Sequence, residues 1–244
     1  MDMKWMRSRV VAVATAVFFF SAFGLTAAPV LAQTTMGQEG GTFKDTSAFK
    51  PPAGAKVAII EWQDLQCPAC AHAFPIVHQA VAHYNIPLEE KDFPLPQHQV
   101  LGSLDGAVWA RYLQVKVSPK VADEYRGAVF AAQTGITNKD DMIAFTRRFF
   151  QSHSLQMPFV ADPSGELMKE IQTDKVLGEK VGVNQTPTII VCSAKEWVHV
   201  TDVSLLYQAI DQVMAKAGAA APAKAASAKA TTVKKPAVKT ATAH

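Results

Sequence analysis

The chain has 244 residues, of which 49% are hydrophobic and 18% are charged, and it carries a formal net charge of +3 with only three cysteines. The compositions of both ends are unlike that of a packed core, so the length fits one folded domain better than two. Three cysteines are too few for a disulfide framework and leave one unpaired.

The first 32 residues have the pattern of a secretory signal peptide. Basic residues up to Arg9 precede an apolar run at 10–25, and small residues lead to Ala32, after which cleavage is expected. A retained membrane anchor is the alternative, disfavoured because the uninterrupted apolar run is shorter than the roughly 20 residues that span a bilayer. Secretion predicts a periplasmic or otherwise extracytoplasmic location, where disulfides persist.

Residues 216–244 are expected to form a disordered basic tail, because they contain neither acidic residues nor Phe, Tyr or Trp. The six lysines of this tail and the surplus of two positive charges in residues 1–32 leave −5 on residues 33–215. Such a tail could contact anionic envelope components, or could be solvated without a partner. Nucleic acid is not an expected partner of an exported chain.

The predicted elements follow in chain order after a linker at 33–52. A β-branched run at 56–62 predicts a buried strand, and the apolar positions after it repeat at helical spacing. This helical face comprises Cys70, Phe74, Val77, Val81 and Tyr84. The remaining elements are a strand at 86–93, helices at 104–115, 120–134, 140–152 and 164–180, strands at 188–192 and 197–200, and a helix at 203–217. This order predicts an α/β fold with a helical insertion at about 100–180.

Two cysteines, Cys67 and Cys70, fall where the first strand gives way to the helix. Unpaired backbone N–H groups and the positive end of the helix dipole both favour a thiolate at Cys67. In such motifs the pKa of the first cysteine can fall to between about 3.5 and 7.5. Cys70, one turn further along, is placed to resolve a mixed disulfide, and Pro68 suits the first helical turn.

A metal site and a structural disulfide are two alternative interpretations of the cysteine pair. A structural zinc site needs four ligands, usually with a second Cys or His pair, whereas His72, His78 and His83 lie on the same helix and are expected to point elsewhere. A purely structural disulfide across one helical turn would close a very small loop and constrain the unfolded chain little. A reactive pair is therefore favoured.

The segment EWQDLQCPAC at 61–70 resembles the active-site segment of the DsbA-like branch of the thioredoxin superfamily. Pro75 matches the helix-kinking proline of thioredoxin, and GVNQTPTIIV at 182–191 resembles the family's cis-proline strand. The segment DFPLP at 92–96, with His98, also matches. The resemblance covers about residues 53–215 and implies a thioredoxin fold with a helical insertion.

The resemblance also implies a role for five residues. Cys67 would be the exposed nucleophile and Cys70 its buried partner. Pro187 would be cis and lie against the pair, and the backbone of Thr186 could bind an extended substrate peptide as an added strand. Glu61 would be the buried acid that accepts the Cys70 proton, although an ordinary strand-end carboxylate is the alternative.

The sequence also gives expectations for four residues outside these five. Asp64 is expected to be a surface turn residue, and His98 either has a family role or caps a helix. Cys192 is expected to be a small buried hydrophobe of the strand at 188–192. Ala69 stands where the most oxidising family members carry histidine, so a less oxidising pair is expected and the direction of electron flow is open.

The sequence therefore predicts an exported DsbA-like thiol–disulfide oxidoreductase that acts on protein thiols or disulfides through a redox-active Cys67–Cys70 disulfide. It implies a membrane redox partner, and neither an organic cofactor nor a metal. One alternative is a copper(I)-handling chaperone that uses the same two sulfurs as soft ligands. Another is a non-enzymatic envelope-binding protein that works through its lysine tail.

Overall fold

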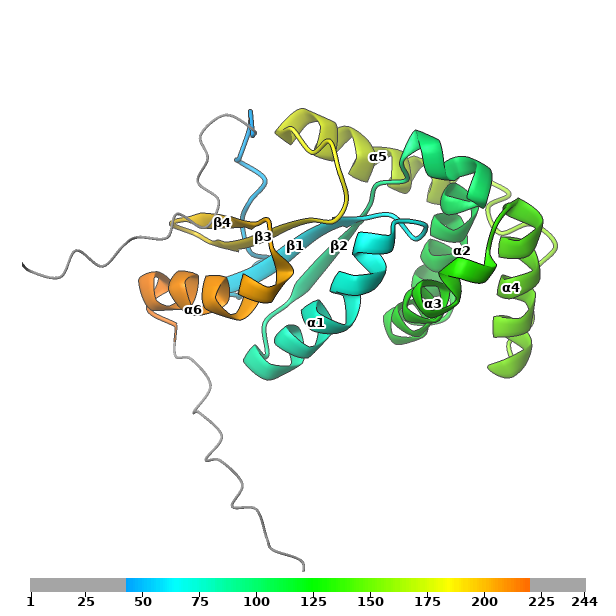
Figure 1. Cartoon of the computed structure of the whole chain (residues 1–244), viewed down its shortest axis with the longest axis horizontal. Helices are drawn as coiled ribbons and strands as arrows, with labels where there is room; N and C mark the ends of the chain where they lie inside the picture. The colour runs from blue at the N-terminus through cyan, green and yellow to red at the C-terminus, as the bar shows by residue number, and fades with distance from the viewer. Residues whose placement is uncertain (1–42, 220–244) are drawn as a thin grey trace, which may run out of the picture. The chain divides into compact units, whose positions relative to one another are not determined.

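A computed structural model describes residues 43–219, which are built around a four-stranded mixed sheet of order β2-β1-β3-β4 (Figure 1). The central strand β1 (Val57–Gln63) runs parallel to β2 (Leu88–Asp92) and antiparallel to β3 (Thr188–Ser193). The edge strand β4 (Trp197–Val200) pairs antiparallel with β3. Because β1 and β3 are buried along their whole length, both faces of the sheet must be covered.

Helices cover the two faces of the sheet separately (Figure 1). One face packs against α1 (Pro68–Tyr84) and α6 (Leu206–Ala217), and the other against α5 (Glu166–Val181) and the segment around Phe49. Gly178 lets α5 approach the sheet, because a Cβ there would lie 2.9 Å from the indole nitrogen of Trp62. The apolar face shared with α6 thus fixes α1, which begins at Pro68, against the central strands.

The helical insertion forms a further core of its own. It contains α2 (Ser103–Lys116), α3 (Pro119–Ala132) and α4 (Lys139–Ser152), and side chains from all three pack in one apolar cluster with Leu65, Cys67 and Cys70. Two short 3₁₀ helices, η1 (Pro96–Leu101) and η2 (Gln133–Gly135), accompany these helices, and a third, η3 (Val203–Leu205), precedes α6. The insertion therefore packs directly on the turn that carries the cysteines.

A buried group of charges fastens the insertion to β2. Arg126 of α3 donates to Asp92 at 2.7 Å, and Arg111 of α2 bridges Asp92 and Asp174. Asp92 and Arg126 are both almost inaccessible to solvent. Since an unpaired charge is costly to bury, these ion pairs constrain how α2, α3 and α5 meet the sheet edge.

The predicted order of strands and helices and the α/β fold with a helical insertion are confirmed. The predicted helical face of α1 is partly wrong, since Phe74 and Val81 are only half-buried whereas Ala73 and Ala80 are fully buried. These two helix positions point at the sheet and contribute to its core. Small residues allow a close helix-to-sheet approach, so apolar size alone did not identify the buried face.

Only parts of the predicted terminal segments are described. Within the predicted linker at 33–52, residues 43–52 are not a free connection, because Phe49 is 2% exposed and stacks edge-on against Trp62 and Trp197. The predicted signal peptide and residues 220–244 of the predicted tail lie outside the described residues. In residues 43–219 no helix is both long and apolar enough to cross a membrane.

Candidate active site

Cys67 lies at the junction between the turn that follows β1 and the first residue of α1. It is the N-cap of α1 with an extended backbone, and its N–H donates to the carbonyl of Asp64 at 3.0 Å. Pro68 occupies the first helical position, as predicted, where its missing N–H costs no hydrogen bond. The backbone thus presents the Cys67 sulfur to the N–H groups that begin the helix.

The accessibility of the two cysteines corrects one expectation. Cys70 is fully buried, as predicted, but Cys67 is only 6% exposed rather than an exposed nucleophile. Both belong to the apolar cluster of the helical insertion, which closes over the start of α1. Little of Cys67 is therefore accessible to a reaction partner in this conformation.

The surroundings of Cys67 favour its thiolate. Its pKa is lowered to about 5, first by a hydrogen bond from the Cys70 thiol, and then by Thr186 and by backbone N–H groups of Cys70 and Ala69, against the opposing effect of burial. In its protonated form Cys67 donates to the carbonyl of Thr186 at 3.2 Å. The net effect leaves Cys67 ionised at neutral pH and hence nucleophilic.

Cys70 has the opposite character. Burial raises its pKa well above the ordinary value, and the hydrogen bond to Cys67 and the negative charges of Cys67 and Glu61 raise it further. The two sulfurs of one helical turn therefore differ in protonation at neutral pH. Such a difference separates an attacking thiolate from a thiol that must first lose a proton.

Thr186 and Pro187 form the loop that lies against Cys67. The peptide bond between them is cis, as predicted, and the loop leads directly into β3. Thr186 is 9% exposed, and its hydroxyl has no hydrogen-bond partner within the described part of the chain. The contact with Cys67 thus joins two segments that are 119 residues apart in sequence.

Glu61 lies on β1 and is 1% exposed. Burial first, and repulsion from Glu90 second, raise its pKa to about 8, although Arg126 acts in the other direction. Its oxygen Oε1 has no hydrogen-bond partner among residues 43–219. These features fit the buried acid implied by the family resemblance and not an ordinary strand-end carboxylate, which would be solvated.

Asp64 is not the surface turn residue that was expected. It is 2% exposed and accepts hydrogen bonds from the backbone of Gln66 and Leu95, from His98 Nδ1 at 2.9 Å and from Ser103 Oγ at 2.5 Å. The carboxylate therefore ties the cysteine turn to the segment that begins the helical insertion. His98 contributes to this tie through its ring nitrogen.

Gln133 is a second anchor of the cysteine turn that the sequence interpretation missed. Its side-chain amide donates to the carbonyl of Leu65 at 3.0 Å, across 68 residues of sequence. An aspartate in a turn and a glutamine at a helix end have common local explanations, so no signal in the sequence singles out either. Their partners are brought within reach only by the packing of the insertion.

Three other residues lie apart from this site. Cys192 is fully buried on β3 within the apolar cluster of the α5 face, as expected of a small hydrophobe, and is a free thiol. His72 and His83 are exposed on α1. None of these residues is brought near the Cys67 sulfur by a contact in the structure.

The family comparison agrees with the geometry of the site. A family model described as thioredoxin matches residues 52–211. The chain belongs to the thioredoxin family. A search of curated proteins gave no match.

Solved structures of DsbA-type proteins share the fold at low sequence identity. The thiol-disulfide exchange protein alpha-DsbA2 from Wolbachia pipientis has a TM-score of 0.52 and 16% identity, with 67% of this chain and 85% of that chain covered. Wolbachia alpha-DsbA1 gives 0.55 and 18%, with 69% and 90% covered. A periplasmic thioredoxin-like protein from Salmonella enterica serovar Typhimurium gives 0.53 and 17%, with 68% and 88% covered. The predicted DsbA-like resemblance is therefore confirmed at the level of the fold.

Proposed function

We propose that this protein is a thiol–disulfide oxidoreductase that exchanges disulfides with protein substrates through Cys67 and Cys70. The observation that carries the proposal is the pairing, at the start of α1, of a Cys67 sulfur with a pKa of about 5 and a Cys70 thiol whose pKa is raised. A purely structural disulfide would have no need of this asymmetry. The thioredoxin family membership and the DsbA-like fold support the same activity.

The exchange proceeds through a mixed disulfide. In the reducing direction, the Cys67 thiolate attacks one sulfur of a substrate disulfide and the other substrate sulfur leaves as a thiolate. Cys70 then gives up its proton and attacks Cys67, which forms the Cys67–Cys70 disulfide and releases the second substrate thiol. In the oxidising direction the same steps run in reverse, with electrons passing from the substrate to the pair.

Glu61 and Thr186 have supporting roles in this proposal. Glu61, whose pKa is near 8, is mostly protonated at neutral pH, and it is the minor ionised form that accepts the proton that Cys70 must lose before it attacks. The backbone at Thr186, beside the cis Pro187 and in contact with Cys67, binds the substrate as an extended strand across the sulfurs. No organic cofactor or metal enters the reaction, because the sulfurs carry the electrons.

The direction of electron flow depends on the reduction potential of the pair. Stabilising the thiolate stabilises the reduced form, and a Cys67 pKa of about 5 lies between the values of about 3.5 for a strong oxidant and about 7 for a reductant. We therefore propose a reduction potential of the pair between about −120 mV and about −270 mV. Equilibration with glutathione buffers, followed by thiol alkylation to quantify the reduced form, measures this potential. The predicted export places the protein in the periplasm, with a membrane redox protein as electron partner.

Substitution of Cys67 by serine tests the proposal. Cys67→Ser should abolish both insulin reduction and oxidation of a dithiol peptide, because it removes the attacking sulfur. Cys192→Ser, which changes the cysteine that lies apart from the pair, should keep both activities. Activity that survives Cys67→Ser would contradict the proposal. Stoichiometric copper(I) binding by a reduced chain that exchanges no disulfides would favour the metal-handling alternative instead.

A further inference from the structure

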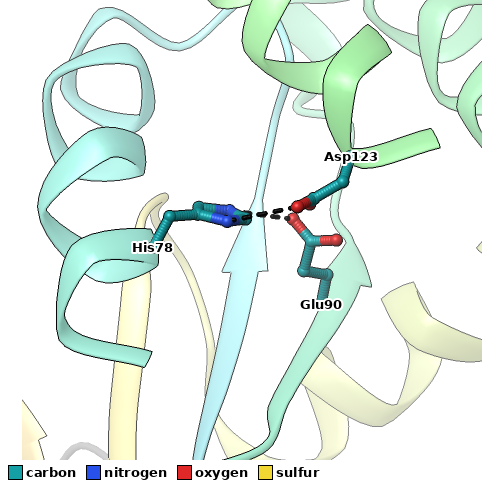
Figure 2. Close-up of side chains that lie close together, drawn as sticks. All are labelled: His78, Glu90 and Asp123. Atoms are coloured by element: carbon teal, nitrogen blue, oxygen red, sulfur yellow. Dashed lines mark ion pairs between the residues drawn. The ribbon is translucent and has the colours of Figure 1, made fainter. Parts of the chain in front are cut away.

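Three side chains that do not contact the cysteine pair meet beside the C-terminal half of α1. His78 of α1, Glu90 of β2 and Asp123 of α3 point toward one another (Figure 2). His78 Nδ1 lies 3.3 Å from Asp123 Oδ2, and His78 Nε2 lies 3.9 Å from Glu90 Oε1. His78 lies eleven residues after Cys67, about three helical turns away.

The spacing of these side chains suits one small metal ion. Among residues 43–219, one nitrogen of His78 and one oxygen of each carboxylate all lie within 4.8 Å of one another. Ligands bound tetrahedrally at about 2.0–2.2 Å are separated by roughly 3.3–3.6 Å. The present arrangement would therefore have to contract by up to about 1.5 Å to close three ligands around one ion.

The imidazole of His78 has an unsatisfied nitrogen. Its Nε2 is inaccessible to solvent and has no hydrogen-bond partner among the described residues. The Phe74 ring packs on the imidazole at a centroid distance of 3.9 Å, which holds the ring in place. Because a buried polar atom without a partner is costly, this nitrogen points to a ligand that the polypeptide itself does not supply.

Glu90 is held in orientation by neighbouring polar groups. The side-chain amide of Gln63 donates to Glu90 Oε1 at 2.7 Å, and Arg126 Nε lies 3.6 Å from the other oxygen, Oε2. Outer partners of this kind orient metal-binding carboxylates. Arg126 also opposes a cation, but its guanidinium already pairs with Asp92 at 2.7 Å.

The lysines that line the same cavity are occupied elsewhere. Lys91 lies 3.3 Å from Glu89 and Lys120 lies 3.6 Å from Glu124, so neither is paired with the His78 group. The cavity has a volume of about 620 Å³ and is lined by all three candidate ligands. Its volume leaves room for an ion and for a water at a fourth position.

We propose that His78, Glu90 and Asp123 bind a divalent first-row transition metal ion, with zinc as the best match. One imidazole nitrogen and two carboxylate oxygens form a common donor set for zinc, and a water would complete a tetrahedron. The ion would join α1, β2 and α3 and would thus brace the helix of the cysteine pair against the helical insertion. The site is separate from Cys67 and Cys70 and does not depend on their proposed activity.

Zinc titration of the full chain tests this site. The Cys67→Ser/Cys70→Ser double variant serves as the parent, because it removes two soft sulfur ligands that would compete for zinc. Calorimetry with zinc chloride should show one equivalent bound, and adding His78→Gln should weaken the affinity at least about tenfold. The matched control is His83→Gln, on the same helix but exposed, which should leave the affinity unchanged.

X-ray absorption of the zinc-loaded parent gives an independent measurement. It should show only nitrogen and oxygen neighbours at about 2.0–2.2 Å, whereas a sulfur shell near about 2.3 Å would overturn the proposal. Should His78→Gln fail to fold by circular dichroism, Asp123→Asn replaces it with the same expected loss. The absence of stoichiometric binding, or an equal loss in His83→Gln, would also overturn the proposal.

Discussion

Two groups of buried ionisable side chains lie beside the same sheet and differ in how they are paired. Around the end of β2, Asp92 is held by Arg126 and Arg111. Around the start of α1, Glu61 keeps an oxygen without a partner, and Cys70 is buried without an opposite charge to balance its thiolate. One group is electrostatically satisfied, and the other is left with protons to exchange.

The effect on protonation shows what this difference means. Burial alone would raise the pKa of Asp92, but Arg126 and Arg111 hold it below its ordinary value, so this charge is fixed. The pKa of Glu61 is raised to about 8 because the charge of Arg126 only partly offsets the effects of burial and of Glu90. Paired charges therefore serve to fix the structure, whereas the poorly paired group sits where proton transfer is needed.

Breaking the paired group should have the largest effect. Arg126→Met removes one of the two guanidinium groups that pair with Asp92 and leaves only Arg111 to offset this buried carboxylate, which should lower the free energy of unfolding by about 3 kcal/mol. Urea denaturation of the reduced chain measures this loss. The exposed Arg147, changed to methionine on α4, is the control and should change stability little. Similar losses for the two variants would mean that the pairing is not what stabilises β2.

Neutralising Glu61 should alter the pH dependence of stability. The folded pKa of Glu61, about 8, exceeds its ordinary value of 4.5, so the folded state retains a proton that the unfolded state loses. This contribution to stability is full below pH 4.5 and is lost as the pH rises to 8. Glu61→Gln should therefore gain about 2 kcal/mol relative to the parent between about pH 5 and about pH 6.5, because the parent loses about 1.4 kcal/mol for each pH unit inside this window.

The Glu61 measurement is made on the oxidised protein, so that Cys67 and Cys70 do not titrate. Urea denaturation at several pH values gives the two stability curves, and only their difference is interpreted. Glu166→Gln, at an exposed position of α5, should follow the parent curve. Parallel curves for Glu61→Gln and the parent would show that the Glu61 carboxyl is better compensated than its surroundings indicate.

Removing the hydrogen bond between the cysteines should have the smallest effect. The Cys70 thiol is the largest cause of the lowered pKa of Cys67, so Cys70→Ala should raise that pKa from about 5 by about one unit, or about 1.4 kcal/mol. The rate of iodoacetamide alkylation as a function of pH reports the Cys67 thiolate. Cys192→Ala should leave this titration unchanged, and an unchanged pKa in Cys70→Ala would assign the thiolate's stability to the helix N–H groups instead.

Local sequence predicted the main features of the site because its signals are local. The β-branched run before Cys67 and the apolar period after it predicted the junction between β1 and α1, and Pro68 marked the first helical turn. The resemblance to DsbA-like proteins then implied the cis Pro187. These are short-range patterns, and the packing of distant segments did not override them.

Contacts between distant segments escaped the sequence interpretation. Asp64 was expected at the surface, yet its carboxylate is buried because Leu95, His98 and Ser103 converge on it. Cys67 was expected to be exposed, yet the helical insertion closes over it. In both cases the decisive neighbours are more than 25 residues away, where local patterns carry no information.

The sequence by itself determined the order of strands and helices and placed a reactive cysteine pair at the start of a helix, because backbone preference and apolar spacing act over a few residues. The tertiary structure decided the chemistry around that pair. Only packing brings Thr186 to Cys67, buries Glu61 without a full partner, and gathers His78 with Glu90 and Asp123. Burial and charge proximity depend on which distant segments meet, and these determine the protonation of the sulfurs.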